Sequence, residues 1–219
     1  MNLARYIDHT VLKPTTLPQN VAALCNEAIE NEFAAVCVPP FYTKLAASFT
    51  KDTAVKVCTV IGFPFGYSDM AAKVKETQTA IADGADELDI VINLCALKSG
   101  DIGYLSKEIT ACLQPIRLHD KTVKVIVESG ILIDEEIAAC CNLYARHKVD
   151  FVKTSTGYAE KGASVHAVSL MRGLLPPEIA IKASGGIRNL AFAEELIAAG
   201  AARIGTSSGV AIVKEAQAT

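Results

Sequence analysis

Short apolar runs, many rich in β-branched residues, alternate along the chain with longer segments that carry apolar residues at three- and four-residue spacing. Seven runs are typical of strands, and a weaker run over 6–11 precedes them; the seven are 34–38, 55–61, 87–92, 123–127, 151–153, 180–183 and 203–205. Their nearly continuous apolar character is typical of parallel strands covered on both faces. The pattern therefore predicts up to eight parallel strands.

Helical patterns fall between these runs. Helices are predicted over 19–30, 70–82, 101–118 and 190–199, with another beginning at Asp134. Ser68-Asp69 and Asn189 are the expected N-terminal caps, and Pro115 is expected to end or bend its helix early. The alternation indicates right-handed βαβ units, so we predict one (β/α)8 TIM-barrel domain over 1–219. An open doubly wound sheet is the alternative, although the G-x-G-x-x-G fingerprint of a dinucleotide site is absent.

Composition and charge narrow the range of partners. The 219 residues are 51% hydrophobic and 21% charged, with a net charge of −3 and no basic run, so we expect no nucleic-acid partner. No segment approaches 18 apolar residues and the first residues lack a signal-peptide core, so we expect no membrane span and no secretion. The seven cysteines show no C-x-x-C spacing, which favours reduced thiols in a cytoplasmic protein.

Three charged residues interrupt or end apolar strand runs: Asp89 in ELDIVIN, Lys153 in FVKTSTG and Lys182 in IKASGG. In a barrel of this kind the working groups stand at the carboxyl ends of the strands. The two lysines belong to consecutive strands. The positive charge of each would lower the pKa of the other, and the apolar surroundings would lower the pKa of both. A neutral amine can attack a carbonyl, so the pair is a candidate Schiff-base site.

Each of these residues also has a purely structural interpretation. The lysines could be salt-bridged to carboxylates at the barrel rim. Asp89 could exchange protons during catalysis or could neutralise a lysine, and the two roles are compatible. Asp86 and Glu87 are expected at the solvated entry of their strand.

Two glycine- and serine-rich loops, SGGIRN and IGTSSG, follow consecutive late strands. Exposed backbone N–H groups and a following helix N-terminus favour phosphate at such positions. The four histidines (His9, His119, His147 and His166) show no metal-binding spacing, so we predict no metal site. His9 is expected to be a hydrogen-bonded structural residue.

The chain resembles the deoxyribose-phosphate aldolase family of class I aldolases. The resemblance runs from YIDHTVLKP through VCTVIGFPFG, ELDIVIN and LKSGD to FVKTSTGY, IKASGGIR and IGTSSGV, and FVKTSTG together with KASGG is specific to that family among barrels. Tyr158 departs from its pattern, in which Phe or Lys is commoner.

The resemblance implies the site. It assigns the imine-forming amine to Lys153, the second active-site lysine to Lys182 and the proton-relay carboxylate to Asp89. The phosphate contacts that it implies are Gly157, Gly185, Gly186, Ser207 and Ser208. The implied reaction is the reversible cleavage of 2-deoxy-D-ribose 5-phosphate to glyceraldehyde 3-phosphate and acetaldehyde, without metal or organic cofactor, in a homodimer. The alternatives are a transaldolase-like enzyme, which would release no acetaldehyde, and a catalytically silent barrel that binds a phosphometabolite.

Overall fold

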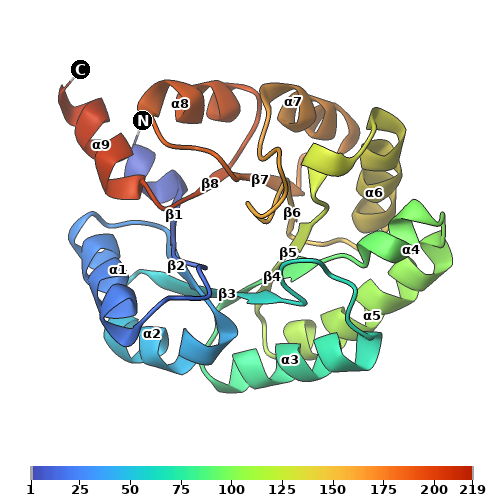
Figure 1. The fold of residues 1–219 in the computed structure, drawn as a ribbon, viewed down its shortest axis with the longest axis horizontal. Coiled ribbons are helices and arrows are strands. Elements are labelled where there is room, and N and C mark those ends of the chain that lie inside the picture. The colour runs from blue at the N-terminus through green and yellow to red at the C-terminus, as the bar shows by residue number, and fades with distance from the viewer. Residues whose placement is uncertain (1, 219) are drawn as a thin grey trace.

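The computed structural model describes residues 2–218, in which eight parallel strands close into a barrel (Figure 1). Each strand pairs with the next, and β8 pairs with β1. The strands are β1 Ile7–Thr10, β2 Ala35–Val38, β3 Lys56–Ile61, β4 Glu87–Val91, β5 Thr122–Ile126, β6 Phe151–Lys153, β7 Ala180–Ser184 and β8 Arg203–Thr206. The predicted (β/α)8 barrel is therefore confirmed, and the open sheet is excluded.

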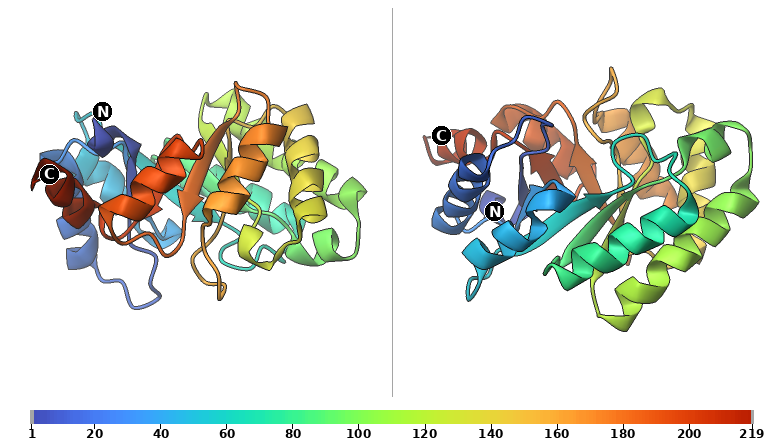
Figure 2. Two further views of the ribbon diagram at one scale, coloured as in Figure 1. Left: turned by 90° about the horizontal axis from the view of Figure 1, so that it is seen from above. Right: turned by 60° about the horizontal axis from the view of Figure 1, so that its bottom comes forward.

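Helices form an outer layer around the strands, and the side views show them lying along the barrel wall (Figure 2). The α-helices are α1 Pro18–Glu30, α2 Thr43–Thr50, α3 Met70–Ala82, α4 Leu94–Lys98, α5 Ile102–Leu118, α6 Asp134–Arg146, α7 Val165–Leu174, α8 Leu190–Ala198 and α9 Gly209–Ala218. Three short 3-10 segments are also present: η1 Leu3–Tyr6 precedes β1, whereas η2 Pro40–Tyr42 and η3 Ser129–Ile131 lie in connections that follow β2 and β5. No helix between residues 2 and 218 combines the length and apolar character needed to cross a lipid bilayer.

The predicted elements agree with the structure to within one or two residues at most ends. The two predicted caps form: the Asp69 carboxylate accepts from the Ala71 N–H, and the Asn189 side chain accepts from the Phe192 N–H. Pro115 does not end its helix, because α5 continues to Leu118. Buried Ile116 and, one turn earlier, buried Cys112 fix the end of the helix to the core, which outweighs one lost backbone hydrogen bond. The helices α2, α4 and α7 were not predicted.

The strand register determines which charged residues meet inside the barrel. Asp89 on β4 lies opposite Lys124 on β5, and Lys153 on β6 lies opposite Lys182 on β7. All four charged side chains are buried, and the strand residues around them are apolar. Since burying an isolated charge is costly, these residues must be compensated by one another.

Candidate active site

Asp89, Lys153 and Lys182, the three residues singled out in the sequence, meet inside the barrel. The Nζ atoms of Lys153 and Lys182 both lie 2.7 Å from Oδ2 of Asp89. One carboxylate oxygen therefore joins the amines of two neighbouring strands. Asp89 thus neutralises lysines, as its structural interpretation requires, and is also placed to exchange protons with them.

Four further charged residues, which the sequence analysis did not assign to the site, complete this cluster. Lys124 contacts Oδ1 of Asp89 at 3.0 Å and Glu87 at 2.5 Å. Lys182 contacts Asp8 at 2.5 Å, and Arg203 binds both Asp8 and Glu87. We call these seven residues the charge cluster: Asp8, Glu87, Asp89, Lys124, Lys153, Lys182 and Arg203.

The signal that identified Asp89 was also present for Lys124, which interrupts the apolar run TVKVI. The expectation that Glu87 is solvated is wrong, because its side chain is buried and paired with Lys124 and Arg203. Glu87 begins its strand, but the barrel closes around that position and supplies two basic partners.

The charge cluster determines the protonation of its members. Burial raises the pKa of Asp89, but Lys124, Lys153 and Lys182 outweigh this and hold that pKa well below its usual range. Burial lowers the pKa of Lys182, but Asp8 and Asp89 outweigh it and raise that pKa above its ordinary value. The expectation of a depressed pKa is therefore wrong for Lys182. Two close carboxylates act on this ammonium more strongly than the neighbouring basic groups do.

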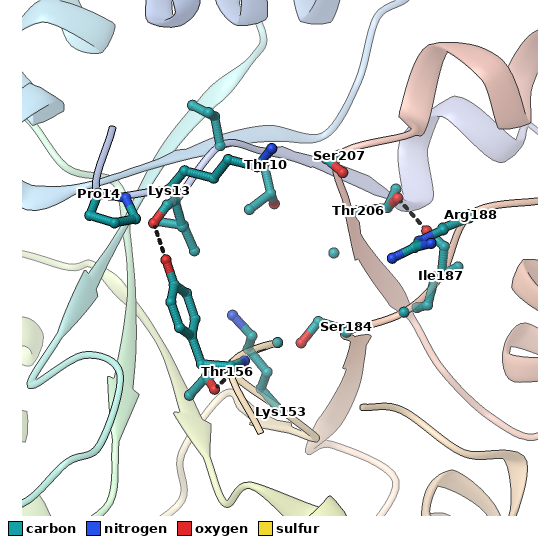
Figure 3. Close-up of a pocket in the computed structure, with 17 residues that line it drawn as sticks. Thr10, Lys13, Pro14, Lys153, Thr156, Ser184, Ile187, Arg188, Thr206 and Ser207 are labelled. Atoms are coloured by element: carbon teal, nitrogen blue, oxygen red, sulfur yellow. Dashed lines mark hydrogen bonds between the residues drawn. The ribbon is translucent and has the colours of Figure 1, made fainter. Parts of the chain in front are cut away.

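A cavity of about 500 Å³ opens above the charge cluster at the carboxyl ends of the strands. Lys153 lines it, whereas Lys182 and Asp89 lie below its surface and are not among the lining residues. Figure 3 shows the Lys153 amine pointing into the cavity, with Arg188 and Ser207 on the opposite side. Among the three residues singled out, Lys153 is therefore the one that an entering molecule meets.

The predicted phosphate loops, together with Gly157 in the loop after β6, form a further part of the cavity wall. Gly157, Gly185, Gly186 and Ser207 line the cavity, whereas Ser208 does not. The N–H of Ser208 instead donates to Oγ1 of Thr206 at 2.9 Å. The three glycines have φ values of +87°, +90° and +81° respectively, a backbone region that favours glycine.

Two exposed basic side chains, Lys13 and Arg188, also line this cavity. Together with the glycine loops they provide positive charge and small residues at one site. This combination suits an anionic group such as a phosphate.

Two buried groups of side chains have donor atoms close enough to hold a metal ion: Cys37, Cys58 and Asp89, and Asp8, Cys58 and Glu87. The histidine spacing could not have revealed them. Their carboxylate oxygens are bonded to lysines, however, and Lys124 also contacts the Cys58 sulfur at 3.4 Å. A divalent cation would have to enter beside four basic side chains, which disfavours it electrostatically.

His9 belongs to neither of these groups of donors. Its Nε2 is 2.7 Å from Glu27 on α1, and its ring packs edge-on against Phe33. These contacts agree with the predicted structural histidine.

Comparison with known proteins identifies the family. A family model described as DeoC/LacD family aldolase matches residues 3–215. Deoxyribose-phosphate aldolase 1 of Oceanobacillus iheyensis is 48% identical over 219 residues, covering 100% of this chain and 99% of that protein. A deoxyribose-phosphate aldolase of Streptococcus suis is 49% identical over 218 residues, covering 100% and 98%.

Solved structures agree with these matches. The tetrameric deoxyribose phosphate aldolase from Aeropyrum pernix is 34% identical with a TM-score of 0.92, covering 98% of this chain and 91% of that one. The aldolase QR15 is 40% identical with a TM-score of 0.94, covering 100% and 97%. With matches over nearly its whole length, the chain belongs to the DeoC/LacD family of aldolases.

Proposed function

We propose that this protein is an aldehyde-lyase that reversibly cleaves 2-deoxy-D-ribose 5-phosphate to D-glyceraldehyde 3-phosphate and acetaldehyde through a Schiff base on Lys153. The observation that supports it most is the lysine amine at the base of the cavity, held at 2.7 Å from a carboxylate that it shares with a second lysine. The named relatives act on deoxyribose phosphate, which suits a cavity with a basic, glycine-rich wall.

Lys153 is the better nucleophile of the two lysines. It lines the cavity, whereas Lys182 is fully buried and paired with both Asp8 and Asp89. The raised pKa of Lys182 keeps it an ammonium, which can donate a proton but cannot attack a carbonyl. Asp89, with its pKa held low, remains a carboxylate that can accept one.

The reaction then follows from these positions. The Nζ of Lys153 adds to the C1 aldehyde of the open-chain sugar, and loss of water from the carbinolamine gives a protonated imine. The electrons of the C2–C3 bond move into this imine and leave an enamine, while the C3 hydroxyl loses its proton and becomes the aldehyde of glyceraldehyde 3-phosphate. Protonation of the enamine at C2 and hydrolysis release acetaldehyde and restore Lys153.

Asp89 and Lys182 move the protons in these steps. Asp89 is hydrogen-bonded to the Lys153 amine, and Lys182 is hydrogen-bonded to the same oxygen of Asp89. Each can therefore exchange protons with the reacting groups directly or through water. The phosphate is held by Gly157, Gly185, Gly186 and Ser207, which line the cavity; Ser208 does not line it, and its N–H is donated to Thr206. Binding at this distant group orients the reacting carbons above Lys153.

The proposal also covers the cofactor requirement, the cellular compartment and the assembly of the enzyme. The chemistry uses protein side chains alone, so no cofactor is required. The cysteines of the described residues are free thiols, which favours a reducing cytoplasm. We propose a homodimer as the assembly, although the Aeropyrum pernix relative is described as a tetramer.

Borohydride trapping tests the function. Incubation with 2-deoxyribose 5-phosphate and borohydride, followed by peptide mass spectrometry, should place a reduced adduct on Lys153. Without borohydride, the same mixture should release acetaldehyde and glyceraldehyde 3-phosphate. Lys153→Ala should abolish both signals, and Lys107→Ala, at an exposed position on α5, is the matched control that should retain them.

The other outcomes separate the alternatives. An adduct on Lys153 without acetaldehyde release would indicate a transaldolase-like reaction. Binding of the phosphosugar with no adduct on any lysine would refute the covalent mechanism and leave a silent barrel.

A further inference from the structure

A second cavity of about 470 Å³ adjoins the catalytic one. The two share four lining residues, Leu12, Lys13, Pro14 and Tyr158. The second cavity lies toward the loops that follow β2 and β3, on the side of these residues away from the phosphate loops. The shared residues therefore form the wall between the two spaces.

The lining of the second cavity is apolar. Its residues include Leu12, Pro14, Pro40, Phe41, Val60 and Phe63. Apart from Lys13, an exposed residue of the shared wall, its polar side chains are already hydrogen-bonded to the main chain. Tyr42 donates to the Thr16 carbonyl at 2.9 Å, Thr16 donates to the Lys13 carbonyl at 2.7 Å, and Glu76 accepts from the Gly62 N–H at 2.7 Å. The space therefore suits a hydrocarbon group rather than a second charged one.

Tyr158 is the largest side chain of the shared wall, and it is fixed from two sides. Its hydroxyl donates to the Leu12 carbonyl at 2.8 Å, which ties the loop after β6 to the loop after β1. Its ring packs edge-on against Phe63, with centroids 5.4 Å apart. These contacts hold the ring in the wall that the two cavities share.

We propose that Tyr158 determines aldehyde selectivity by closing the catalytic cavity against this apolar space, so that the alkyl chain of a long aldehyde on Lys153 must stay in the polar cavity and such aldehydes are disfavoured. The inference rests on the proposed function, because it concerns aldehydes that form an imine with Lys153. Removal of the ring joins the two cavities. The alkyl chain of an aldehyde on Lys153 then enters the apolar space, where its methylene groups leave water.

The test is reductive trapping with a chain-length series of acetaldehyde, butanal and hexanal. The trapping rate at Lys153 is measured for each aldehyde by peptide mass spectrometry in wild type, Tyr158→Ala and Tyr158→Phe. Each rate is divided by that of acetaldehyde in the same variant, so that a general loss of activity or folded protein cancels. Tyr67→Ala, at an exposed tyrosine outside both cavities, is the matched control.

Tyr158→Ala should raise the hexanal-to-acetaldehyde ratio at least about tenfold, with a smaller rise for butanal, because burial of two methylene groups is sufficient for such a factor. Tyr158→Phe keeps the ring and loses only the hydroxyl bond, so its ratio should rise less. Tyr67→Ala should keep the wild-type ratio.

Two results would overturn the inference. An adduct with acetaldehyde but an unchanged hexanal ratio in Tyr158→Ala refutes the inference alone. No adduct with acetaldehyde in the wild type refutes the proposed function and this inference together.

Discussion

Lys124 offers a direct test of how the charge cluster stabilises the fold. Its side chain is fully buried and lies 2.5 Å from Glu87, 3.0 Å from Asp89 and 3.8 Å from Asp8. Burial lowers its pKa, but these carboxylates and Cys58 raise it well above the ordinary value, so the residue is an ammonium. Lys124→Met removes this charge and keeps most of the side-chain volume.

The expected loss of stability in Lys124→Met depends on the ion pairs that remain in the charge cluster. Breaking a buried ion pair by removal of one partner costs about 3–5 kcal/mol, because a charge is left uncompensated. In this cluster each carboxylate keeps another basic partner, since Arg203 binds Asp8 and Glu87, and Lys153 and Lys182 bind Asp89. We therefore expect the lower end, about 3 kcal/mol in the free energy of unfolding. For a chain of this length, that is a fall of about 6–12 °C in Tm.

The assay is denaturant unfolding at pH 7 followed by circular dichroism, with Lys98→Met as the control. Lys98 makes an equally short contact, 2.6 Å to Glu136, but its side chain is 42% exposed. Because water and salt screen such a pair, Lys98→Met should cost less than about 1 kcal/mol. If the two variants lose equal stability, or Lys124→Met loses less than about 1 kcal/mol, the buried cluster does not stabilise the fold as argued.

The remaining predictions concern acid stability and the phosphate wall. Asp8 and Asp89 have folded-state pKa values below the unfolded value of about 3.9, so the unfolded chain binds protons first as the pH falls. The free energy of unfolding should accordingly be steady above about pH 5 and fall below about pH 4; a urea series from pH 7 to pH 3 that stays flat would contradict this. At the phosphate wall, Gly185→Ala and Gly186→Ala should both raise KM for the phosphosugar, because both residues have positive φ, which costs an alanine about 1–2 kcal/mol. Gly185→Ala should also lower Tm further in thermal melts, since its Cβ would lie 3.0 Å from Cα of Gly162 whereas that of Gly186 meets nothing within 4 Å; equal melting temperatures would count against the loop geometry.

Much of the fold could be predicted because its determinants are local. The apolar runs and the intervening helical periodicity depend on residues a few positions apart, so strands such as 151–153 were placed correctly. The caps at Asp69 and Asn189 are equally local. Helices α2, α4 and α7 were missed. The first two are only eight and five residues long and leave little periodicity to detect.

Parts of the candidate site were also visible in the sequence. A charged residue within an apolar strand run is costly to bury, and this unusual placement marked Asp89, Lys153 and Lys182. The glycine-rich loops marked the cavity wall, although Ser208 proved to lie outside the cavity lining. Lys124 carried the same signal and was missed.

The sequence by itself determined the alternation of strands and helices, the barrel class and three residues of the charge cluster. Only the tertiary structure decided how the cluster is connected, because closure of the barrel brings together residues as far apart as Asp8 and Arg203, 195 positions along the chain. The same closure surrounds Lys182 with two carboxylates and raises a pKa that the sequence suggested was depressed. It also brings Tyr158 to Leu12. Periodicity reports which residues are buried, whereas their partners depend on register and closure, which no local pattern encodes.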